Sequence, residues 1–542
     1  MKAGRVIDGD EHDARTLAQQ IVTDARTEAE QLRDGARGDA DKIKSDVKAL
    51  ASSILSDARG EAERITAQAE ADAARLRDDA RALANALVRG ARSTDHERSD
   101  EDPGDAQVTG RVPRFQEGAH ETEPGRVDEV VGLVVRATIP GVSLGELVKI
   151  DRKAGNQPHP INAEVVGFRG EQALLLPLGE LAGVAPASAV WRTGEPLSIR
   201  CGDDLLGRAL DGLGQPIDGG VALTGERWWV DRNAPPALER PPITAPLATG
   251  VRAIDSMLAI GRGQRLGLFA AAGVGKTTLL GQIARNANAD VIVVCQVGER
   301  GRELAELLGD ELAPARAKTV VVCATSDAPP LVRLRAVHVA TAIAEWFREQ
   351  RGASVLLLVD SLTRVARAQR EVGLSAGEPP ARHGYPPSVF ALLPRLIERA
   401  GATANGAITG LYTVLVAGND LDEPIADEVR GLVDGHIILD RRLAQRGHFP
   451  PIDVVASVSR LMHRVIDAEH ARAAGIIRAK LAVYEEHRDL ITLGAYQAGR
   501  DRTVDAAVAA YPAIVGLLQQ RRDEPADWDR TLSQLAVVAG RA

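Results

Sequence analysis

Large aliphatic side chains recur every eleven residues through the first part of the chain. They occupy positions Ile21, Leu32, Ile43, Ile54, Ile65, Leu76 and Leu87. Alanines fill most of the remaining positions of the same stripe, and the first 90 residues contain no proline. Eleven residues in three turns correspond to about 3.67 residues per turn, so the stripe stays on one face of a straight or weakly right-handed coil.

This stripe predicts a long helix over residues 1–92 that pairs with another helix as a coiled coil. At about 1.5 Å per residue, residues 21–87 would form a rod of roughly 100 Å. Alanine permits a close approach of two helices but buries little area, so such a pair is only modestly stable. A single solvated helix is the alternative.

Proline, glycine and charged residues fill positions 93–125, which predicts a flexible linker. Short β-branched runs follow, separated by turn residues, as in "DEVVGLVVRATIPG", "INAEVVGFRG", "EQALLLPLG" and "PLSIRCG". They predict a small β-barrel or sandwich over residues 126–222 that ends in the turn-rich "LLGRALDGLGQPIDGG".

Apolar strand patterns alternate with helical patterns over residues 223–460, which predicts an α/β domain with a mostly parallel sheet. The strands are expected in "QRLGLFA", "ADVIVVCQVGER", "AKTVVVCATSD", "ASVLLLVDSLTR" and "AITGLYTVLV". Polar residues follow several of these strands, at the sheet edge where ligands bind in open α/β folds. Residues 461–542 show helical patterns only.

Composition excludes several classes of protein. A hydrophobic share of 44% and a charged share of 26% fit a soluble globular chain, and 542 residues suffice for roughly three or four domains. The net charge of −9 argues against binding nucleic acid through bulk charge. Three scattered cysteines predict no disulfide framework, and the eleven histidines show no metal-ligand spacing. We expect neither a signal peptide nor a membrane span.

The stretch "FAAAGVGKTTLL" resembles a phosphate-binding loop between a strand and a helix. Such a loop needs inward-facing backbone N–H groups, a lysine for the β- and γ-phosphates, a hydroxyl for Mg²⁺ and a helix N-terminus facing the anion. Ala270 replaces the first glycine of the usual pattern, where the chain is still extended and alanine is tolerated. The residues expected to bind nucleotide are Gly273, Val274, Gly275, Lys276, Thr277 and Thr278.

Two further strand ends supply carboxylates. Asp360 ends "VLLLVD" and is expected, with Thr277, to hold Mg²⁺. Glu299 ends "VIVVCQVGE" and could orient and deprotonate a water in line with the γ-phosphate. With the loop and Asp360 expected on neighbouring strands, these side chains predict an ATP hydrolase.

Several long motifs extend this prediction. "GERGREL", "DSLTRVARAQREVGLSAGEPPARHGYPPSVF" and "GHFPPIDVVASVSR" resemble the type III secretion and flagellar protein-export ATPases, which are relatives of the catalytic subunit of rotary ATP synthases. The resemblance runs from about Arg126 to the C-terminus. It implies an N-terminal β-barrel, a RecA-like P-loop ATPase core and a C-terminal helical domain, with ATP and Mg²⁺ as ligands.

The resemblance also assigns roles to single residues. It implies that Glu299 is the general base, that Arg300 contacts the γ-phosphate and that Lys276 is catalytic. Arg460, in "SVSR", matches an arginine finger that reaches the neighbouring subunit's site, and Phe449 matches an aromatic that packs on adenine.

The same resemblance implies a cytoplasmic homohexamer at the inner face of the membrane. Its implied partners are export-gate membrane proteins, a central stalk protein, a stator protein and chaperone–cargo complexes at the C-terminal domain, with no nucleic acid. The first 120 or so residues depart from the family and resemble the coiled coil of the separate stator protein. A fortuitous alanine-rich coil and a misassigned start codon are the alternatives.

Competing functions are distinguished by single features. A non-catalytic ring subunit typically has Gln at the position of Glu299, and an RNA-translocating hexamer needs a basic, aromatic surface that a 3% aromatic share does not offer. A pure scaffold does not explain the phosphate loop. A subunit of a proton-driven ATP synthase is the main alternative, and the choice between flagellum and injectisome stays open.

Overall fold

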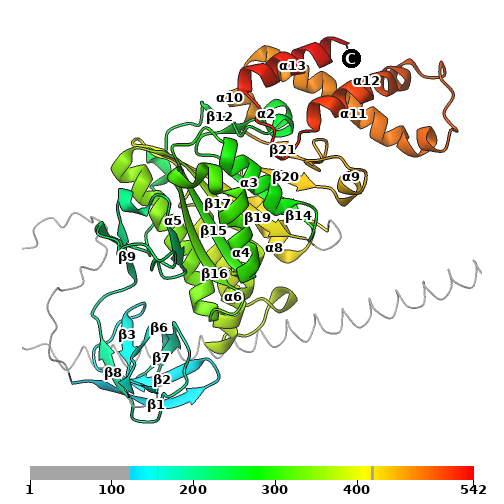
Figure 1. Cartoon of the computed structure of the whole chain (residues 1–542). Helices are drawn as coiled ribbons and strands as arrows, with labels where there is room; N and C mark the ends of the chain where they lie inside the picture. The colour runs from blue at the N-terminus through cyan, green and yellow to red at the C-terminus, as the bar shows by residue number, and fades with distance from the viewer. Residues whose placement is uncertain (1–122, 155–156, 417–419, 542) are drawn as a thin grey trace, which may run out of the picture. The chain divides into compact units, whose positions relative to one another are not determined.

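The computed structural model describes residues 123–154, 157–416 and 420–541. The expected rod and nearly all of the expected linker lie outside these residues. Figure 1 shows the described chain with its elements labelled. Among the helices of the described part, none combines the length and apolar content that crossing a bilayer requires.

The first part of the described chain is a closed barrel in the order β1-β2-β7-β6-β3-β8. Its strands are β1 (Gly125–Val131), β2 (Val134–Thr138), β3 (Leu147–Ile150), β6 (Ile161–Arg169), β7 (Gln172–Pro177) and β8 (Ala189–Arg192). Alternate side chains point inward because successive strand residues face opposite sides, and Val148 and Ile150 of β3 are fully buried. The barrel therefore has its own small apolar core.

β9 and β10 fall within residues 126–222 but lie outside this barrel. β9 (Ser198–Cys201), which contains the run "PLSIRCG", pairs instead with β11 (Glu226–Trp229). β10 (Ala209–Asp211) joins the edge of the large sheet by pairing with β16. The barrel closes through β8 and β1, so the later strands have no free barrel edge to join.

The core domain is built on a nine-stranded sheet in the order β10-β16-β15-β17-β19-β14-β20-β21, with β18 beside β19. The bounds are β14 (Arg265–Ala270), β15 (Val291–Glu299), β16 (Thr319–Thr325), β17 (Ser354–Asp360), β18 (Gly401–Ala402), β19 (Ala407–Leu415), β20 (Gly435–Leu439) and β21 (Val458–Ser459). β10, β16, β15, β17, β19, β14 and β20, taken in their order across the sheet, run parallel, so their carboxyl ends share one edge of the sheet.

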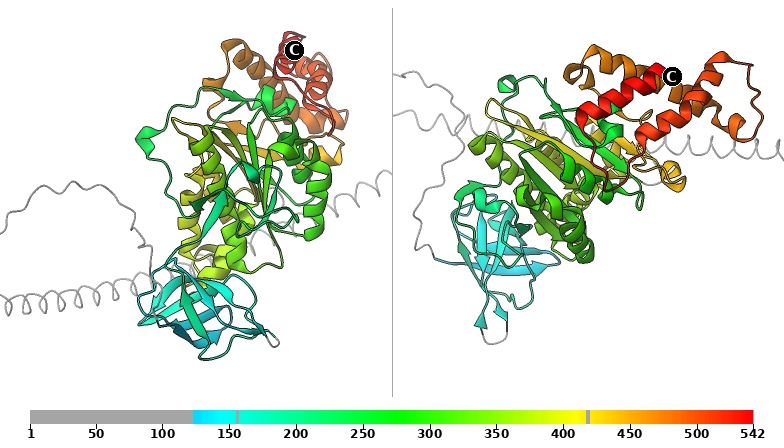
Figure 2. Two further views of the ribbon diagram at one scale, coloured as in Figure 1. Left: turned by 60° about the vertical axis from the view of Figure 1, so that its left-hand side comes forward. Right: turned by 45° about the horizontal axis from the view of Figure 1, so that its top comes forward.

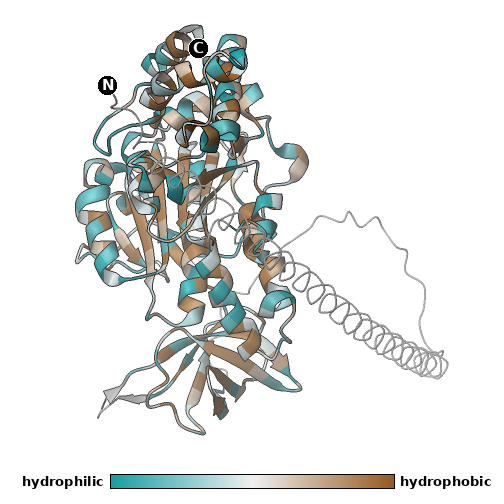
Figure 3. Cartoon of the chain, turned by 90° about the vertical axis from the view of Figure 1, so that its right-hand side faces the viewer, coloured by the Kyte–Doolittle hydropathy of each residue, from teal (hydrophilic) through white to brown (hydrophobic). Residues whose placement is uncertain are grey.

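Helices cover both faces of this sheet, as the two views in Figure 2 show. The covering helices are α3 (Lys276–Asn286), α4 (Gly301–Glu306), α5 (Pro330–Arg351), α6 (Leu362–Ser375), α7 (Pro387–Ile397) and α8 (Pro424–Leu432). The short α2 (Arg252–Met257) contacts the C-terminal helices. In β15, Val293 and Cys295 pack in the cluster that includes α5 to α8, whereas Ile292 and Val294 pack with α2 and α3. Burial on both faces explains why the strands are continuous apolar runs, drawn brown in Figure 3.

The chain ends in helices α11 (Ala468–Thr492), α12 (Arg502–Leu518) and α13 (Trp528–Arg541), after the short α9 (Arg441–Gln445) and α10 (Met462–Val465). Ile477, Ile514 and Leu535, one from each long helix, are buried in the same apolar cluster as α2 and α3. The helical domain therefore packs directly on the part of the core that carries the phosphate loop.

A buried ion pair joins the barrel to the core. Arg335 of α5 is paired with Glu164 of β6, and its Nη1 also donates to Asp231 Oδ1 at 2.9 Å. Arg335 and Glu164 are both buried, so each neutralises a charge that would otherwise be costly to bury.

Candidate functional site

The phosphate loop lies between β14 and α3, as the sequence predicts. Ala270 is the last residue of β14 and pairs with Leu415 and Leu439, so this position is ordinary extended strand. Gly273 and Gly275 have φ values of 78° and 95°, a left-handed conformation that favours glycine. Gly275 caps α3, which places the helix N-terminus and its positive dipole end beside the loop.

The predicted lysine and carboxylates come together at the carboxyl edge of the sheet. Lys276 Nζ is bonded to Asp360 Oδ1 and lies 3.9 Å from Glu299 Oε1. Asp360 and Glu299 end β17 and β15, which are neighbouring strands. One detail of the expectation is wrong: β14, which leads into the loop, is separated from β17 by β19.

Two partners of these carboxylates escaped the sequence analysis. Thr413 of β19, the intervening strand, donates to Asp360 Oδ1 at 2.7 Å. Arg364, in the first turn of α6, donates from Nη2 to Glu299 Oε2 at 2.9 Å. Arg364 could have been identified from the sequence, because a basic residue closely follows Asp360 at the start of a helix that leaves the same sheet edge. Nothing in the sequence marked Thr413, because only the order of the strands brings it to Asp360.

The electrostatics of Glu299 are unusual for a carboxylate. Burial, followed by a hydrogen bond with Glu303, raises the pKa of Glu299 to about 7, against the lowering effect of Lys276 and Arg364. A carboxyl group with this pKa changes its protonation state near neutral pH, which suits a general base.

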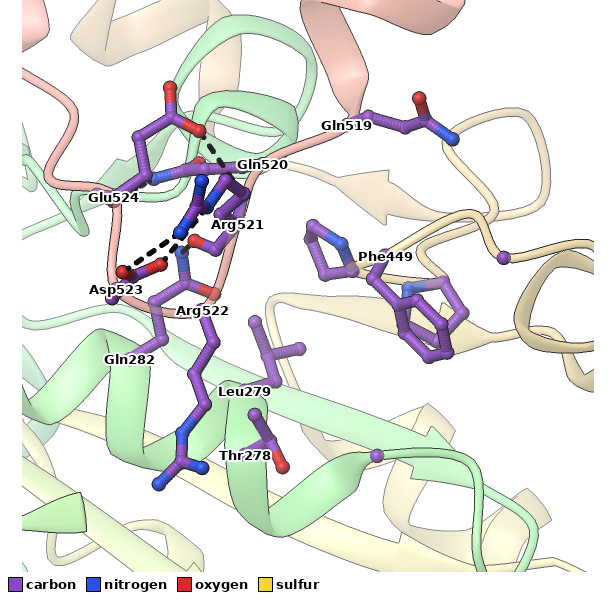
Figure 4. A pocket seen from close by; sticks show the side chains of 14 residues that line it. Thr278, Leu279, Gln282, Phe449, Gln519, Gln520, Arg521, Arg522, Asp523 and Glu524 are labelled. Atoms are coloured by element: carbon purple, nitrogen blue, oxygen red, sulfur yellow. Dashed lines mark hydrogen bonds and ion pairs between the residues drawn. The ribbon is translucent and has the colours of Figure 1, made fainter. Parts of the chain in front are cut away.

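A cavity of about 600 Å³ opens next to the phosphate loop. Its floor includes Thr278 and Leu279 of α3, and its sides are Phe449 and the α12–α13 loop, residues 519–524 (Figure 4). Phe449 is 49% exposed, so its ring is available to a ligand. The α12–α13 loop was not predicted as part of the site, because no motif marks it and only the packing of the helical domain brings it to α3.

The other predicted residues take different positions. Val274 is buried, whereas Thr277 and Arg300 are exposed beside the loop and after β15. Arg460 is exposed and does not line the cavity. β21 runs antiparallel to β20, which places Arg460 at the amino end of the parallel strands, opposite the phosphate loop.

The chemistry of the loop region fits a magnesium ion that arrives with a nucleotide. Thr277 and Asp360 provide a hydroxyl and a carboxylate oxygen, the donor types that Mg²⁺ prefers. Within residues 123–154, 157–416 and 420–541, no cluster of three or more His, Cys, Asp or Glu side chains could hold a metal by itself. Mg²⁺ typically completes its coordination with waters and substrate phosphates, so a small protein donor set is sufficient.

Three family models match successive parts of the chain. The beta-barrel domain of the ATP synthase alpha/beta family matches residues 127–194, and its nucleotide-binding domain matches residues 250–459. The C-terminal domain of the type III secretion ATPase EscN matches residues 466–537. These matches confirm the predicted barrel, ATPase core and helical domain.

Curated relatives from both export systems are equally similar. The flagellum-specific ATP synthase of Bacillus subtilis is 47% identical over 77% of this chain and 95% of its own length. The type 3 secretion system ATPase of Xanthomonas euvesicatoria is also 47% identical, over 77% of this chain and 94% of its own.

Solved structures of a type III secretion ATPase are also similar to this chain. The assembled ATPase EscN of enteropathogenic E. coli matches with a TM-score of 0.72 and 41% identity, over 77% of this chain and all of that one. The same ATPase in complex with its central stalk EscO matches with a TM-score of 0.71 and 41% identity, over the same shares.

Proposed function

Because the chain belongs to the family of type III secretion and flagellum-specific ATPases, we propose that it hydrolyses Mg²⁺-ATP to drive protein export. The observation that carries this proposal is the convergence of Lys276, Glu299 and Asp360 beside a glycine loop and an open cavity. Relatives of both kinds are equally similar, so the proposed machine is either a flagellum or an injectisome.

In the proposed mechanism, the loop amides of residues 273–278 and Lys276 hold the phosphates. Thr277 and Asp360 hold Mg²⁺, which would neutralise charge that develops on the phosphate oxygens. Glu299 takes a proton from the water that attacks the γ-phosphorus, and Arg300 contacts the γ-phosphate. The bond between the γ-phosphorus and the β–γ bridging oxygen breaks, ADP and phosphate leave, and Glu299 gives its proton to the departing phosphate or to solvent. Lys276 forms an ion pair with Asp360, so a phosphate that binds Lys276 competes with this carboxylate for the lysine.

The base would occupy the cavity and pack against the exposed ring of Phe449. The triphosphate of the nucleotide would then extend past Thr278 toward the loop glycines. The same cavity is lined by Gly275, Thr278 and Phe449, so one space would hold both parts of the nucleotide.

Arg460 suits a role in a second subunit. It lies at the opposite end of the parallel strands from the phosphate loop, so it does not serve the site of its own chain. We propose a homohexameric ring in which Arg460 completes the neighbouring site as an arginine finger.

The proposed ring works at the inner face of the cytoplasmic membrane. It would meet export-gate proteins, a central stalk and a stator, and it would receive chaperone–cargo complexes at the helical domain and release and unfold the cargo. EscN has been solved with its central stalk, which supports the stalk assignment. The match of residues 466–537 to an EscN domain favours export over the ATP synthase alternative.

The test of the catalytic assignment is ATP hydrolysis by the purified protein with and without Mg²⁺. Lys276→Ala should abolish activity, and Glu299→Gln should lower kcat by about 10²-fold or more while ATP still binds. Lys149→Ala, which removes an exposed lysine of the barrel, is the matched control. Wild-type hydrolysis by Glu299→Gln would refute the assignment of the base.

A further inference from the structure

The wall of the cavity opposite Phe449 belongs to the helical domain, and it is fixed by one buried amide side chain. We propose that Gln520 is a positioning residue that sets the α12–α13 loop against the nucleotide base and so determines the affinity for ATP. This inference rests on the proposed function, because it names what controls the base side of that site.

Gln520 is 4% exposed and its side chain uses both ends of its amide. Its Oε1 accepts from the backbone N–H of Arg252 at 2.8 Å, at the start of α2. Its Nε2 donates to the carbonyls of Gly250 and Glu524, each at 2.8 Å. One side chain therefore ties the core, through α2, to both ends of a loop in the helical domain.

The backbone of Gln520 connects the loop to Phe449, which lines the other side of the cavity. Its N–H donates to the carbonyl of Phe449 at 2.9 Å. The side chain holds the loop on α2 while the main chain holds Phe449, so a displacement of Gln520 changes the distance between the two sides of the cavity.

Side chains of α2 and α3 hold the rest of the loop. Arg252 donates from Nε to the carbonyl of Leu517 at 3.0 Å and also binds the carbonyl of Gln519 and the carboxylate of Glu524. From α3, Arg285 donates to the carbonyl of Arg522 at 2.8 Å. These bonds occupy the carbonyls of Gln519 and Arg522 in the loop. Figure 4 shows the side chains of the loop across the cavity from Phe449.

This arrangement acts on the base and not on the phosphates. The hydrogen bonds of Gln520 in the described chain go to Gly250, Arg252, Phe449 and Glu524. Lys276 and the carboxylates at the sheet edge are not among its partners. Loss of the Gln520 contacts should therefore weaken binding in the ground state and in the transition state equally, which raises KM and leaves kcat unchanged.

The experiment replaces Gln520 by methionine, which keeps the volume of the side chain and removes its hydrogen bonds. Gln520→Met leaves the N–H of Arg252 and the carbonyls of Gly250 and Glu524 without these partners, so we expect KM for ATP to rise about ten-fold with kcat within about two-fold. Inorganic tripolyphosphate, which has the phosphates and no base, is titrated as a competitive inhibitor. Its inhibition constant should stay within about two-fold of the wild-type value.

A control and a second variant distinguish an effect of the loop position on KM from a general loss of protein structure. Thr531→Val removes a buried hydroxyl of α13 that donates to the carbonyl of Asp527, and it should leave KM unchanged. Arg252→Lys loses the forked contact to Gln519 and Glu524 and should raise KM for ATP, as Gln520→Met does. If Gln520→Met does not fold, the KM of Arg252→Lys tests whether the position of the loop sets the affinity for ATP.

An unchanged KM in these variants, or a tripolyphosphate constant that rises in step with KM, would overturn the inference. Absence of ATP hydrolysis by the wild-type protein would instead overturn the proposed function.

Discussion

Arg364 holds the carboxylate of Glu299 in place from the next strand-to-helix connection of the sheet. Its Nη2 donates to Glu299 Oε2 at 2.9 Å, and its Nη1 binds the carbonyl of Gly298 in the same strand end. One guanidinium therefore fixes both the side chain and the backbone of the proposed base. Arg364 is a positioning residue in this geometry.

Replacement of Arg364 by alanine should lower kcat by about 10²-fold, because a misplaced catalytic group loses most of its effect. Nucleotide binding should be nearly unchanged, because the phosphate loop is intact. Arg367→Ala, an exposed residue of the same helix, is the control. Steady-state kinetics together with nucleotide binding decide the matter, and a normal kcat for Arg364→Ala would contradict the assignment.

The pH dependence follows from Glu299. Its pKa is raised to about 7, mainly by burial, so the carboxyl group is protonated and inactive as a base below that pH. We expect kcat/KM to fall about ten-fold per pH unit as the pH drops below this value. Glu303→Gln removes a contact that raises the pKa and should move the midpoint to lower pH. A profile that stays flat between about pH 6 and 8 would argue against Glu299 as the base.

Mixed rings test the role of Arg460. Arg460→Ala and Glu299→Gln subunits should each be nearly inactive alone, since an arginine finger contributes roughly 10³-fold or more in related reactions. A mixture should recover part of the activity, because some interfaces combine an intact Glu299 with an intact Arg460. Activity is measured after co-assembly, with mixing verified by two affinity tags. No recovery in verified mixed rings would count against a finger that acts between subunits.

The buried ion pair between barrel and core gives a stability prediction. Arg335→Met leaves Glu164 buried without its cation, which should lower the free energy of unfolding by about 3–5 kcal/mol. Arg136→Met breaks a more exposed pair with Glu129 in the barrel and should cost at most about 1 kcal/mol. Urea titrations of the two variants give the comparison, and equal losses would contradict the role of the buried pair.

The N-terminal segment is tested by truncation. Deletion of residues 1–120 should leave a folded, active ATPase, because the barrel begins after this point and has its own core. The truncated ring should detach from the membrane fraction if residues 21–87 act as a tether. The isolated segment should be helical by circular dichroism and should self-associate weakly or bind the stator protein. A monomeric segment without a partner, together with normal localisation of the truncated ring, would exclude the tether.

Local sequence predicts the chemical parts of the site but not their arrangement. Apolar runs locate β14, β15 and β17. Glu299 and Asp360 end two of these strands, and the glycine loop after β14 marks Lys276 at the start of α3. The strand order does not follow from these runs, so the insertion of β19 and the contact of Thr413 with Asp360 required the structure. The same holds for Gln520, whose partners other than Glu524 lie about 70 or 270 residues away in the chain.

The α12–α13 loop has a mechanical consequence. It is continuous with two helices of the C-terminal domain, and it is also a wall of the cavity beside the phosphate loop. A shift of these helices away from α2 widens the cavity directly, without a relay through the sheet. In the proposed site, entry and release of nucleotide would therefore depend on the position of the helical domain, and a load applied to that domain would displace the base before the phosphates.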